Sequence, residues 1–216
     1  MAANLRDFHK FGRKIVGVGF NYKSLMKEMG VKASSVPRIY LKAPSSYVTQ
    51  EGKVKIPNWS PQSIWYEVEL GVIIGENLKK ASPERALEGI GGYCTALDFT
   101  CKDTLLAARE QGLSWAMSKS FDTACAVGDF IPKENFPDPT DVNLWLTLNG
   151  ISKQKGHSSD MTWSAPQLVS IISQYLTLEP GDLILSGTPS GMGIISPGDE
   201  IRAGIEGVDE VRFQVE

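Results

Sequence analysis

Short apolar runs, bounded mostly by turn-forming residues, recur along the whole chain and outnumber its helical segments. Runs of this kind predict strands. The expected strands are residues 14–18, 38–42, 54–58, 66–75, 91–98, 144–148, 151–154, 183–186, 200–205 and 211–215. The expected helices are residues 23–29, a segment that begins at Ser82-Pro83, 102–110 and 165–175. Because strands and helices alternate irregularly, the pattern predicts an α+β fold, with mixed, mostly antiparallel β structure and peripheral helices.

The composition narrows the class of protein further. The chain has 216 residues, a formal net charge of −3 and three cysteines. No apolar run approaches the roughly 18 residues that a membrane span requires, so no membrane partner is expected. The cysteines form no Cys-x-x-Cys pair, which disfavours both a disulfide scaffold and a structural zinc site. Without a repeat or linker, residues 15–216 are predicted to form a single domain after an N-terminal arm, residues 1–14.

Positive charge is concentrated near the N-terminus. Residues 1–42 carry nine Lys and Arg against only Asp7 and Glu28. The basic residues are spread out and no nucleic-acid-binding motif accompanies them, so no nucleic-acid partner is expected. Two interpretations of the first fourteen residues remain open: a weak mitochondrial presequence or a solvated arm. The predicted compartment is therefore mitochondrial or cytoplasmic.

The sequence Glu67-Val68-Glu69 lies in the clearest predicted strand. Side chains two residues apart in a strand point to the same face, so both carboxylates should project together. Apolar residues flank the pair. Like charges in such a setting repel and lose hydration, and a divalent cation would relieve both costs. The alternative is a pair of solvated glutamates on an exposed edge.

Three further positions could carry chemistry. Asp98 closes a small, apolar strand just before a predicted helix, which suits a metal ligand or a plain helix N-cap. Lys119 lies between apolar and small residues, which is more typical of a buried, paired lysine than an average position is, although a surface lysine fits equally well. The segment Gly187-Thr188-Pro-Ser-Gly191 combines glycines with a hydroxyl that could grip an anion, although an ordinary turn fits it too.

Three carboxylates without Cys or His ligands form a hard, all-oxygen site. Such a site favours Mg²⁺, with Mn²⁺ as the next choice, over zinc. Histidine occurs only at His9 and His157, and His157 is interpreted as a surface residue in a hairpin or loop. A serine or cysteine hydrolase would need one of these two histidines, and no G-x-S-x-G elbow surrounds a candidate serine.

Several motifs occur together and in order over almost the whole chain. They are Gly-Phe-Asn21-Tyr22, Tyr66-Glu67-Val-Glu69-Leu-Gly71, Leu97-Asp98-Phe-Thr100, Lys119-Ser-Phe-Asp122, Leu178-Glu-Pro-Gly-Asp182 and Ser186-Gly-Thr-Pro-Ser-Gly191. This set resembles the fumarylacetoacetate hydrolase superfamily. Gly112-Leu-Ser-Trp115 and Pro137-Asp-Pro139 resemble its small acylpyruvase and oxaloacetate decarboxylase branch.

The resemblance implies a β-roll, a homodimer and a metal held by Glu67, Glu69 and Asp98. It also implies an α-keto acid substrate that chelates the metal. The residues implied for binding this substrate are Asn21, Lys102, Lys119 and Thr188. Residues 21–36 would form a lid, on which Glu28 is the implied acid or base together with Lys119.

Some residues depart from the pattern of that family. Hydrolytic members carry an H-x-x-E dyad on the lid, in which the His activates water. Here Leu25 stands at the His position, while Glu28 retains the Glu. Lys102 replaces an expected Arg, and Leu105 and Phe20 replace polar residues found in many relatives, which would remove contacts to the distal end of a substrate.

The resemblance implies enolate chemistry that survives these changes. Decarboxylation of oxaloacetate and its keto–enol tautomerisation both pass through an enolate, which a metal beside the keto oxygen stabilises, and neither needs a hydrolytic base. Oxaloacetate decarboxylation or tautomerisation is therefore the predicted function. Acylpyruvate hydrolysis is the first alternative, and a non-catalytic protein that binds Mg²⁺ and a keto acid is the second.

Overall fold

The fold is organised by one long, curled sheet. A computed structural model describes residues 4–50, 52–60 and 63–216. Within them, an eight-stranded sheet has the order β2-β1-β12-β5-β6-β8-β3, with β9 paired to β6. Its strands are β1 (Ile15–Gly19), β2 (Arg38–Lys42), β3 (Tyr47–Thr49), β5 (Val68–Ile74), β6 (Ile90–Asp98), β8 (Cys125–Val127), β9 (Ile131–Pro132) and β12 (Leu183–Leu185).

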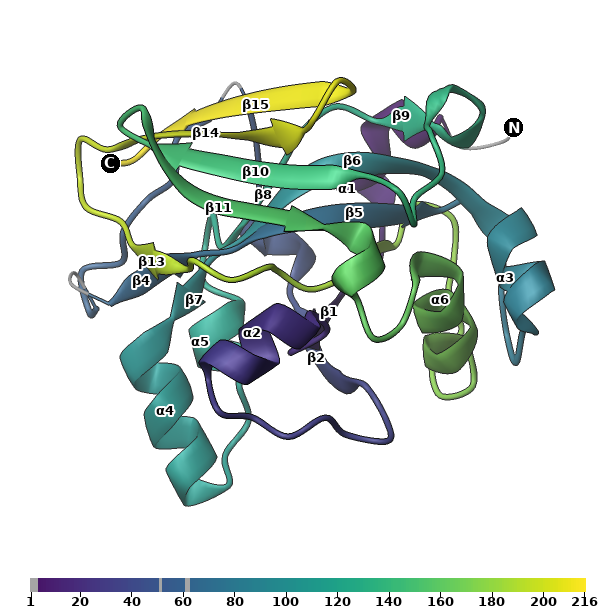
Figure 1. Ribbon diagram of the computed structural model, residues 1–216, viewed down its shortest axis with the longest axis horizontal. Coiled ribbons are helices and arrows are strands. Elements are labelled where there is room, and N and C mark those ends of the chain that lie inside the picture. Colours follow the sequence, from purple (N-terminus) through teal and green to yellow (C-terminus); the bar gives the residue numbers. More distant parts are fainter. Residues whose placement is uncertain (1–3, 51, 61–62) are drawn as a thin grey trace.

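Two smaller sheets complete the β structure. A four-stranded sheet has the order β11-β10-β14-β15, and a three-stranded sheet has the order β13-β4-β7. Their strands are β4 (Ile64–Tyr66), β7 (Thr100–Cys101), β10 (Asn143–Leu148), β11 (Ile151–His157), β13 (Gly193–Ile194), β14 (Glu200–Ile205) and β15 (Asp209–Gln214). Figure 1 shows the four-stranded sheet lying over β5 and β6, and buried apolar side chains of both layers belong to one core cluster.

Helices lie around the sheets in two groups (Figure 1). In Figure 1, α2, α4 and α5 lie on one side of the molecule and α3 and α6 on the other. The helices are α1 (Phe8–Phe11), α2 (Lys23–Glu28), α3 (Pro83–Gly89), α4 (Lys102–Gln111), α5 (Ala116–Lys119) and α6 (Ala165–Ser173). The local sequence explains where two of these helices begin. Ser82 is the N-cap of α3, and Ser164 forms a capping box with Gln167 at the N-terminus of α6.

The predicted fold class is confirmed. Among the described strands, only β1–β12 and β3–β8 pair in parallel, and the remaining pairs are antiparallel. The strand expected at residues 54–58 is wrong, since only Val54 forms an isolated bridge, with Val215. Pro57 lacks the N–H that would continue the ladder. The strand expected at residues 66–75 is also divided, because Glu67 separates β4 from β5.

The N-terminal segment packs against the sheet. Of the predicted arm, residues 1–3 lie outside the described residues, while Phe8 of α1 is 1% exposed in a second, smaller core cluster. Asp182 accepts hydrogen bonds from the backbone N–H groups of Arg13 and Lys14, which fixes the chain just before β1. Among the described helices, none is both long and apolar enough to cross a membrane.

Candidate metal centre and substrate pocket

Three carboxylates converge where β4, β5 and β6 meet. Glu67 lies in the break between β4 and β5, Glu69 lies in β5, and Asp98 ends β6. The backbone N–H of Asp98 donates to the carbonyl of Glu67 at 2.9 Å, which brings the two strands together at this point. One carboxylate oxygen from each of the three residues lies within 4.8 Å of the others. The predicted clustering is therefore present, and it fits the oxygen set that Mg²⁺ and Mn²⁺ prefer.

The structure excludes the two alternatives without a metal, namely solvated glutamates and a helix N-cap at Asp98. Glu69 is 1% exposed and the side chain of Glu67 is 14% exposed, so the alternative of two solvated glutamates on an exposed edge is wrong. The N-cap of α4 is Cys101, so the alternative that Asp98 is a helix cap is wrong as well. Charges this deeply buried need compensation by opposite charge or by hydrogen bonds.

Two buried lysines compensate the negative charge of Asp98. Lys42 Nζ lies 2.5 Å from Asp98 Oδ1, and Lys119 Nζ lies 2.5 Å from Asp98 Oδ2. The hydroxyl of Tyr40 also donates to Oδ2. Burial would raise the pKa of Asp98, but the ammonium groups of Lys119 and Lys42 outweigh it and hold the pKa below its usual range. Asp98 is therefore kept ionised, as a metal ligand must be.

The negative charge of Glu69 is compensated less fully than that of Asp98. The backbone N–H of Gly187 donates to Glu69 Oε2 at 2.6 Å. Burial, together with the negative charges of Asp98 and Glu67, raises the pKa of Glu69 well above its usual value. A divalent cation between the three carboxylates would lower the pKa of Glu69 again, because positive charge favours the ionised carboxylate.

Lys119 confirms the prediction of a buried, paired lysine. Besides Asp98, its ammonium group contacts Glu67 Oε1 at 3.2 Å and Thr100 Oγ1 at 2.5 Å. Burial would lower the pKa of Lys119, but the carboxylates of Asp98 and Glu67 outweigh it and raise the pKa to about 12. Lys119 therefore stays protonated near neutral pH, and it supplies positive charge and a hydrogen-bond donor to the site.

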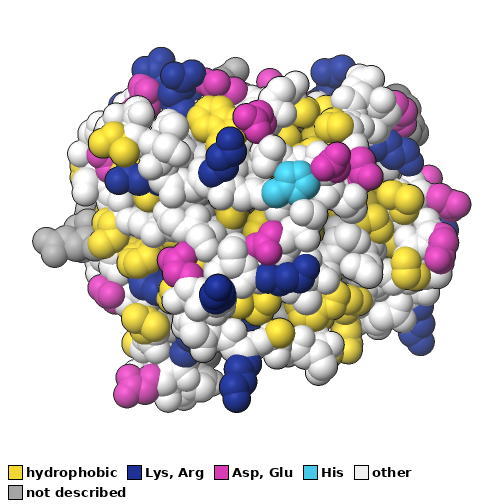
Figure 2. Space-filling view, viewed as in Figure 1, with side chains coloured by type: hydrophobic (Ala, Val, Ile, Leu, Met, Phe, Trp, Pro, Cys, Tyr) yellow, Lys and Arg dark blue, Asp and Glu magenta, His cyan; other side chains and the backbone are white. Residues whose placement is uncertain are grey.

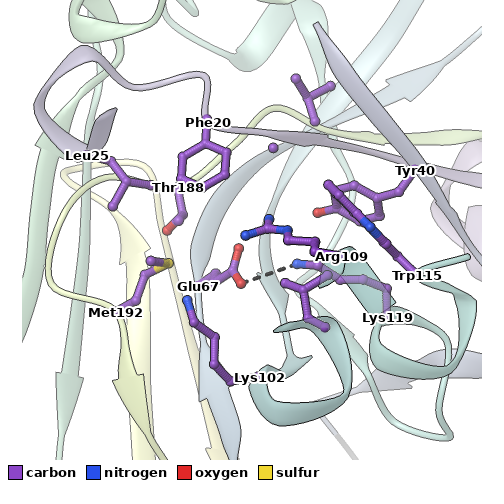
Figure 3. A pocket seen from close by; sticks show the side chains of 13 residues that line it. Phe20, Leu25, Tyr40, Glu67, Lys102, Arg109, Trp115, Lys119, Thr188 and Met192 are labelled. Atoms are coloured by element: carbon purple, nitrogen blue, oxygen red, sulfur yellow. Dashed lines mark hydrogen bonds and ion pairs between the residues drawn. The ribbon is translucent and has the colours of Figure 1, made fainter. Parts of the chain in front are cut away.

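A pocket opens beside this cluster, and Glu67 is part of its lining. Figure 3 shows Glu67 among the side chains that line it, with Lys102, Lys119 and Thr188 around this carboxylate. Thr188 is fixed in place because its hydroxyl donates to the carbonyl of Val68 at 2.8 Å and accepts from the amide of Gln154 at 2.8 Å. Thus the structure brings together the predicted substrate-binding residues Lys102, Lys119 and Thr188 with the predicted ligand Glu67.

Apolar side chains form much of the rest of the pocket lining. Those with fully apolar side chains are Val18, Phe20, Leu25, Leu105 and Met192. Leu25, from α2, is 3% exposed and lies at the pocket rather than on the surface.

Two predicted residues are not brought into the pocket. Asn21 is fully buried, and its side-chain amide donates to the carbonyls of Trp163 and Ser186 while its oxygen accepts from the Trp163 N–H. Its side chain therefore holds the start of α2 against the 186–188 loop. Glu28, at the end of α2, is exposed and does not line the pocket.

His157 ends β11, and its Nε2 lies 3.1 Å from Asp141 Oδ1, as expected of a surface residue.

Sequence reasoning missed Lys42 and Tyr40, which both contact Asp98. It also missed Thr100 and Arg109. The period-2 alternation of strand 38–42 places residues 40 and 42 on one face, and a lysine on the buried face of a strand was the available signal. Arg109 carried no comparable signal, because it follows an ordinary helical pattern.

Comparison with known proteins places the chain in a family. Residues 14–216 match the family model for the C-terminal domain of fumarylacetoacetate (FAA) hydrolase. The chain belongs to the fumarylacetoacetate hydrolase family. It is 39% identical to mitochondrial oxaloacetate tautomerase FAHD1 of Bos taurus, covering 100% of this chain and 98% of that relative. It is 42% identical to the mitochondrial oxaloacetate decarboxylase of Dictyostelium discoideum, over 98% of this chain and 97% of that relative.

A solved enzyme structure superposes closely on this chain. It is the fumarylpyruvate hydrolase of Pseudomonas aeruginosa in complex with Mn²⁺ and pyruvate. The TM-score is 0.89 at 29% identity, and the alignment covers 94% of this chain and 89% of that chain. The resemblance inferred from the motifs is therefore confirmed.

Proposed function

We propose that this chain is an oxaloacetate tautomerase or decarboxylase that uses a divalent cation. The observation that carries the proposal is the convergence of Glu67, Glu69 and Asp98 beside a pocket that Lys119 and Thr188 also line. Relatives that are 38–42% identical over nearly the full chain carry the names oxaloacetate tautomerase and oxaloacetate decarboxylase. Both reactions form an enolate from the same keto acid, so one site can support either.

The proposed cation is Mg²⁺, with Mn²⁺ as the alternative, held by Glu67, Glu69 and Asp98. When bound, it supplies positive charge beside the keto oxygen, where the negative charge of an enolate develops. The protein prepares this site by keeping Asp98 ionised through Lys42 and Lys119. Thr188 lines the pocket and is held there by the hydrogen bond from its hydroxyl to the carbonyl of Val68, so it shapes the wall against which the keto acid would lie. A solved relative in complex with Mn²⁺ and pyruvate supports both the metal and the ligand class.

We assign proton abstraction and charge stabilisation to different residues. Lys119, with its raised pKa, remains an ammonium group near neutral pH, so it suits charge stabilisation and proton donation better than proton abstraction. Glu28 remains the proposed acid or base. Because Glu28 is exposed on α2, it can act only if residues 21–36 close over the pocket as a lid on the catalytic domain, residues 15–216. A Glu28→Gln variant should then lose turnover without losing metal affinity.

Leu25 should suppress hydrolysis. It lines the pocket at the start of the proposed lid, and its side chain cannot take a proton from water. We expect Leu25→His to raise acylpyruvate hydrolysis by at least about 10-fold, because general base catalysis contributes about 10²–10⁴-fold when fully arranged. Pyruvate release from an acylpyruvate measures this, and Leu25→Met is the matched control without a base. Equal rates in the two variants would contradict the proposed role of position 25.

We propose that the protein is a homodimer that associates through β2. This strand ends the eight-stranded sheet, so one of its backbone edges has no strand partner among the described residues. Exposed apolar side chains lie on this strand, just before it and just after α6: Leu41 at 49% exposure, Val36 and Tyr175. An unpaired apolar edge is self-complementary when two copies meet across a twofold axis.

The dimer can be tested at Leu41. Leu41→Glu should convert the dimer to a monomer in light scattering at low micromolar concentration, because a buried unpaired carboxylate disfavours the interface. Leu87, with 50% exposure on α3, gives the matched control Leu87→Glu, which should leave the mass unchanged. A dimer that persists in Leu41→Glu would place the interface elsewhere, and a monomeric wild-type protein would contradict dimerisation itself.

Neither nucleic acid nor a membrane is part of the proposal. Figure 2 shows basic and acidic side chains interspersed on the face drawn there, without a continuous basic field on that face. Several relatives are named as mitochondrial proteins, and we propose the mitochondrion as the compartment, with the cytoplasm as the alternative.

The test of the proposed function follows two products at once. Protein stripped of metal is mixed with oxaloacetate, with and without Mg²⁺, while enol absorbance and pyruvate are both measured. Enol decay beyond that caused by Mg²⁺ alone, without pyruvate, identifies a tautomerase. Pyruvate release beyond the Mg²⁺ control identifies a decarboxylase. No acceleration of either process would refute the proposal and favour a non-catalytic keto-acid-binding protein.

A further inference from the structure

Arg109 presents its guanidinium group to the substrate pocket. The residue lies in the last turn of α4 and lines the same pocket as Glu67 and Thr188. Its guanidinium carbon lies 4.7 Å from the ring centre of Trp115 and 5.4 Å from that of Phe20. Figure 3 shows the guanidinium pointing into the pocket, toward Glu67 and Thr188. Two aromatic rings therefore hold a flat cation at the pocket.

The positive charge around Arg109 exceeds the negative charge available to it. Among the described residues, no carboxylate forms an ion pair with Arg109 or with Lys102, whose ammonium group lies over the ring of Trp65 at 4.6 Å. Arg38 adds a third cation, 5.0 Å from the ring centre of Phe20. The carboxylate that lines the pocket, Glu67, is already bound by Lys119 and Thr100. Two cations of the pocket thus remain without a bound anion.

Holding these cations together has a cost that an anionic ligand would remove. Burial and the nearby charge of Arg38 lower the pKa of Arg109, and burial lowers the pKa of Lys102, while the negative charge of Glu67 opposes both shifts only in part. A carboxylate placed between them would restore favourable charge interactions, and a guanidinium can bind it through two parallel hydrogen bonds. Phe20 and Leu105 stand where polar residues were expected, so they offer no polar contact to a substrate. Arg109, which belongs to none of the sequence motifs, is a hydrogen-bond donor at this part of the pocket.

We propose that Arg109 binds the distal carboxylate of the substrate and thereby selects dicarboxylic keto acids. This inference rests on the proposed function, since the metal site is taken to bind the α-keto acid end. Phe20 and Trp115 act as positioning residues, because their rings keep the guanidinium flat and aimed into the pocket. Lys102 contributes a second positive charge. The competing possibility is that the apolar lining binds an uncharged tail.

Two ligands of equal length separate these possibilities. The dicarboxylate 2-oxoglutarate and the monocarboxylate 2-oxopentanoate differ only at the distal end, where one has a carboxylate and the other a methyl group. Calorimetry on the Mn²⁺-loaded protein gives both affinities without requiring turnover. We expect the wild-type protein to bind the dicarboxylate about 10–100-fold more tightly, because a charge-assisted hydrogen bond is worth roughly this factor.

Substitutions at Arg109 test the assignment. Arg109→Gln should remove the preference for the dicarboxylate and raise the KM for oxaloacetate about 10–100-fold, while the affinity for 2-oxopentanoate changes less than about threefold. Arg109→Lys should keep part of the preference, since it retains the charge without the planar fork. Phe20→Leu should weaken the preference less than Arg109→Gln does. Arg85, paired with Glu76 outside the pocket, gives the control Arg85→Gln, which should behave as wild type.

The outcomes distinguish this inference from the proposed function. A dicarboxylate preference that survives in Arg109→Gln overturns the assignment of Arg109. A wild-type preference for 2-oxopentanoate overturns it too, and shows that the apolar lining receives the tail. If the preference depends on Arg109 but oxaloacetate is not turned over, the inference about Arg109 stands and the proposed activity fails.

Discussion

Glu69→Gln should lower both metal affinity and turnover of oxaloacetate by at least about 100-fold. Removing a residue that merely supports a metal ligand already costs roughly 10–100-fold, and Glu69 is proposed to be a ligand itself. Glutamine keeps the shape of the side chain but loses the charge. Because Glu69 is buried and bound by the Gly187 N–H, its neighbours offer little room for another residue to replace it.

The measurement is Mn²⁺ titration by calorimetry, together with the oxaloacetate assay. Glu76→Gln is the matched control, since Glu76 is exposed and paired with Arg85 at the surface. It should leave metal affinity and turnover unchanged. If Glu69→Gln binds Mn²⁺ as tightly as the wild-type protein, the three carboxylates are not the metal site.

The second large effect is expected at Lys42, which does not line the pocket. Lys42→Met should destabilise the metal-free protein by about 3–5 kcal/mol, because breaking a buried ion pair leaves part of a buried charge uncompensated. Lys42 and Asp98 both have fully buried side chains, and the Lys42 ammonium group also donates to the carbonyl of Phe99 at 3.2 Å.

Urea unfolding measures the stability change, and Lys53→Met is its matched control. Lys53 and Glu216 form an ion pair with side chains that are 58% and 57% exposed. Exposed pairs of this kind contribute about 0–1 kcal/mol, so the control should be nearly as stable as wild type. Equal losses in the two lysine variants would show that burial of the Lys42–Asp98 pair does not govern stability at this site.

The metal-site residues were predictable because short-range rules determine them. Strand alternation brought Glu67 and Glu69 together, and the apolar run before Asp98 indicated its burial. The exact path of the backbone was not predictable, since the break at Glu67 depends on a hydrogen bond from the N–H of Val68 to Gln154, a residue 86 positions away. Motif order then supplied the family, which the comparisons confirmed.

The charge network around the site was less accessible to sequence reasoning. Lys42 and Asp98 are 56 residues apart, and their contact requires β2 and β6 to belong to the same curled sheet. Asn21 was assigned to substrate on the basis of its motif, yet its side-chain amide is bonded to Trp163 and Ser186. The aromatic cradle of Arg109 likewise joins three separate segments of the chain. Each of these contacts depends on tertiary packing, which local patterns do not encode.

The most direct test of the central claim is exchange at C3 of oxaloacetate in D₂O, followed by proton NMR. Formation of an enolate replaces hydrogen by deuterium at this carbon, whether the enolate is then reprotonated or arises from loss of CO₂. With Mg²⁺ present, the wild-type protein should accelerate deuterium incorporation into oxaloacetate or product pyruvate beyond Mg²⁺ alone, and Glu69→Gln should not. Exchange at the rate of Mg²⁺ alone in the presence of the wild-type protein would contradict enolate chemistry at this site.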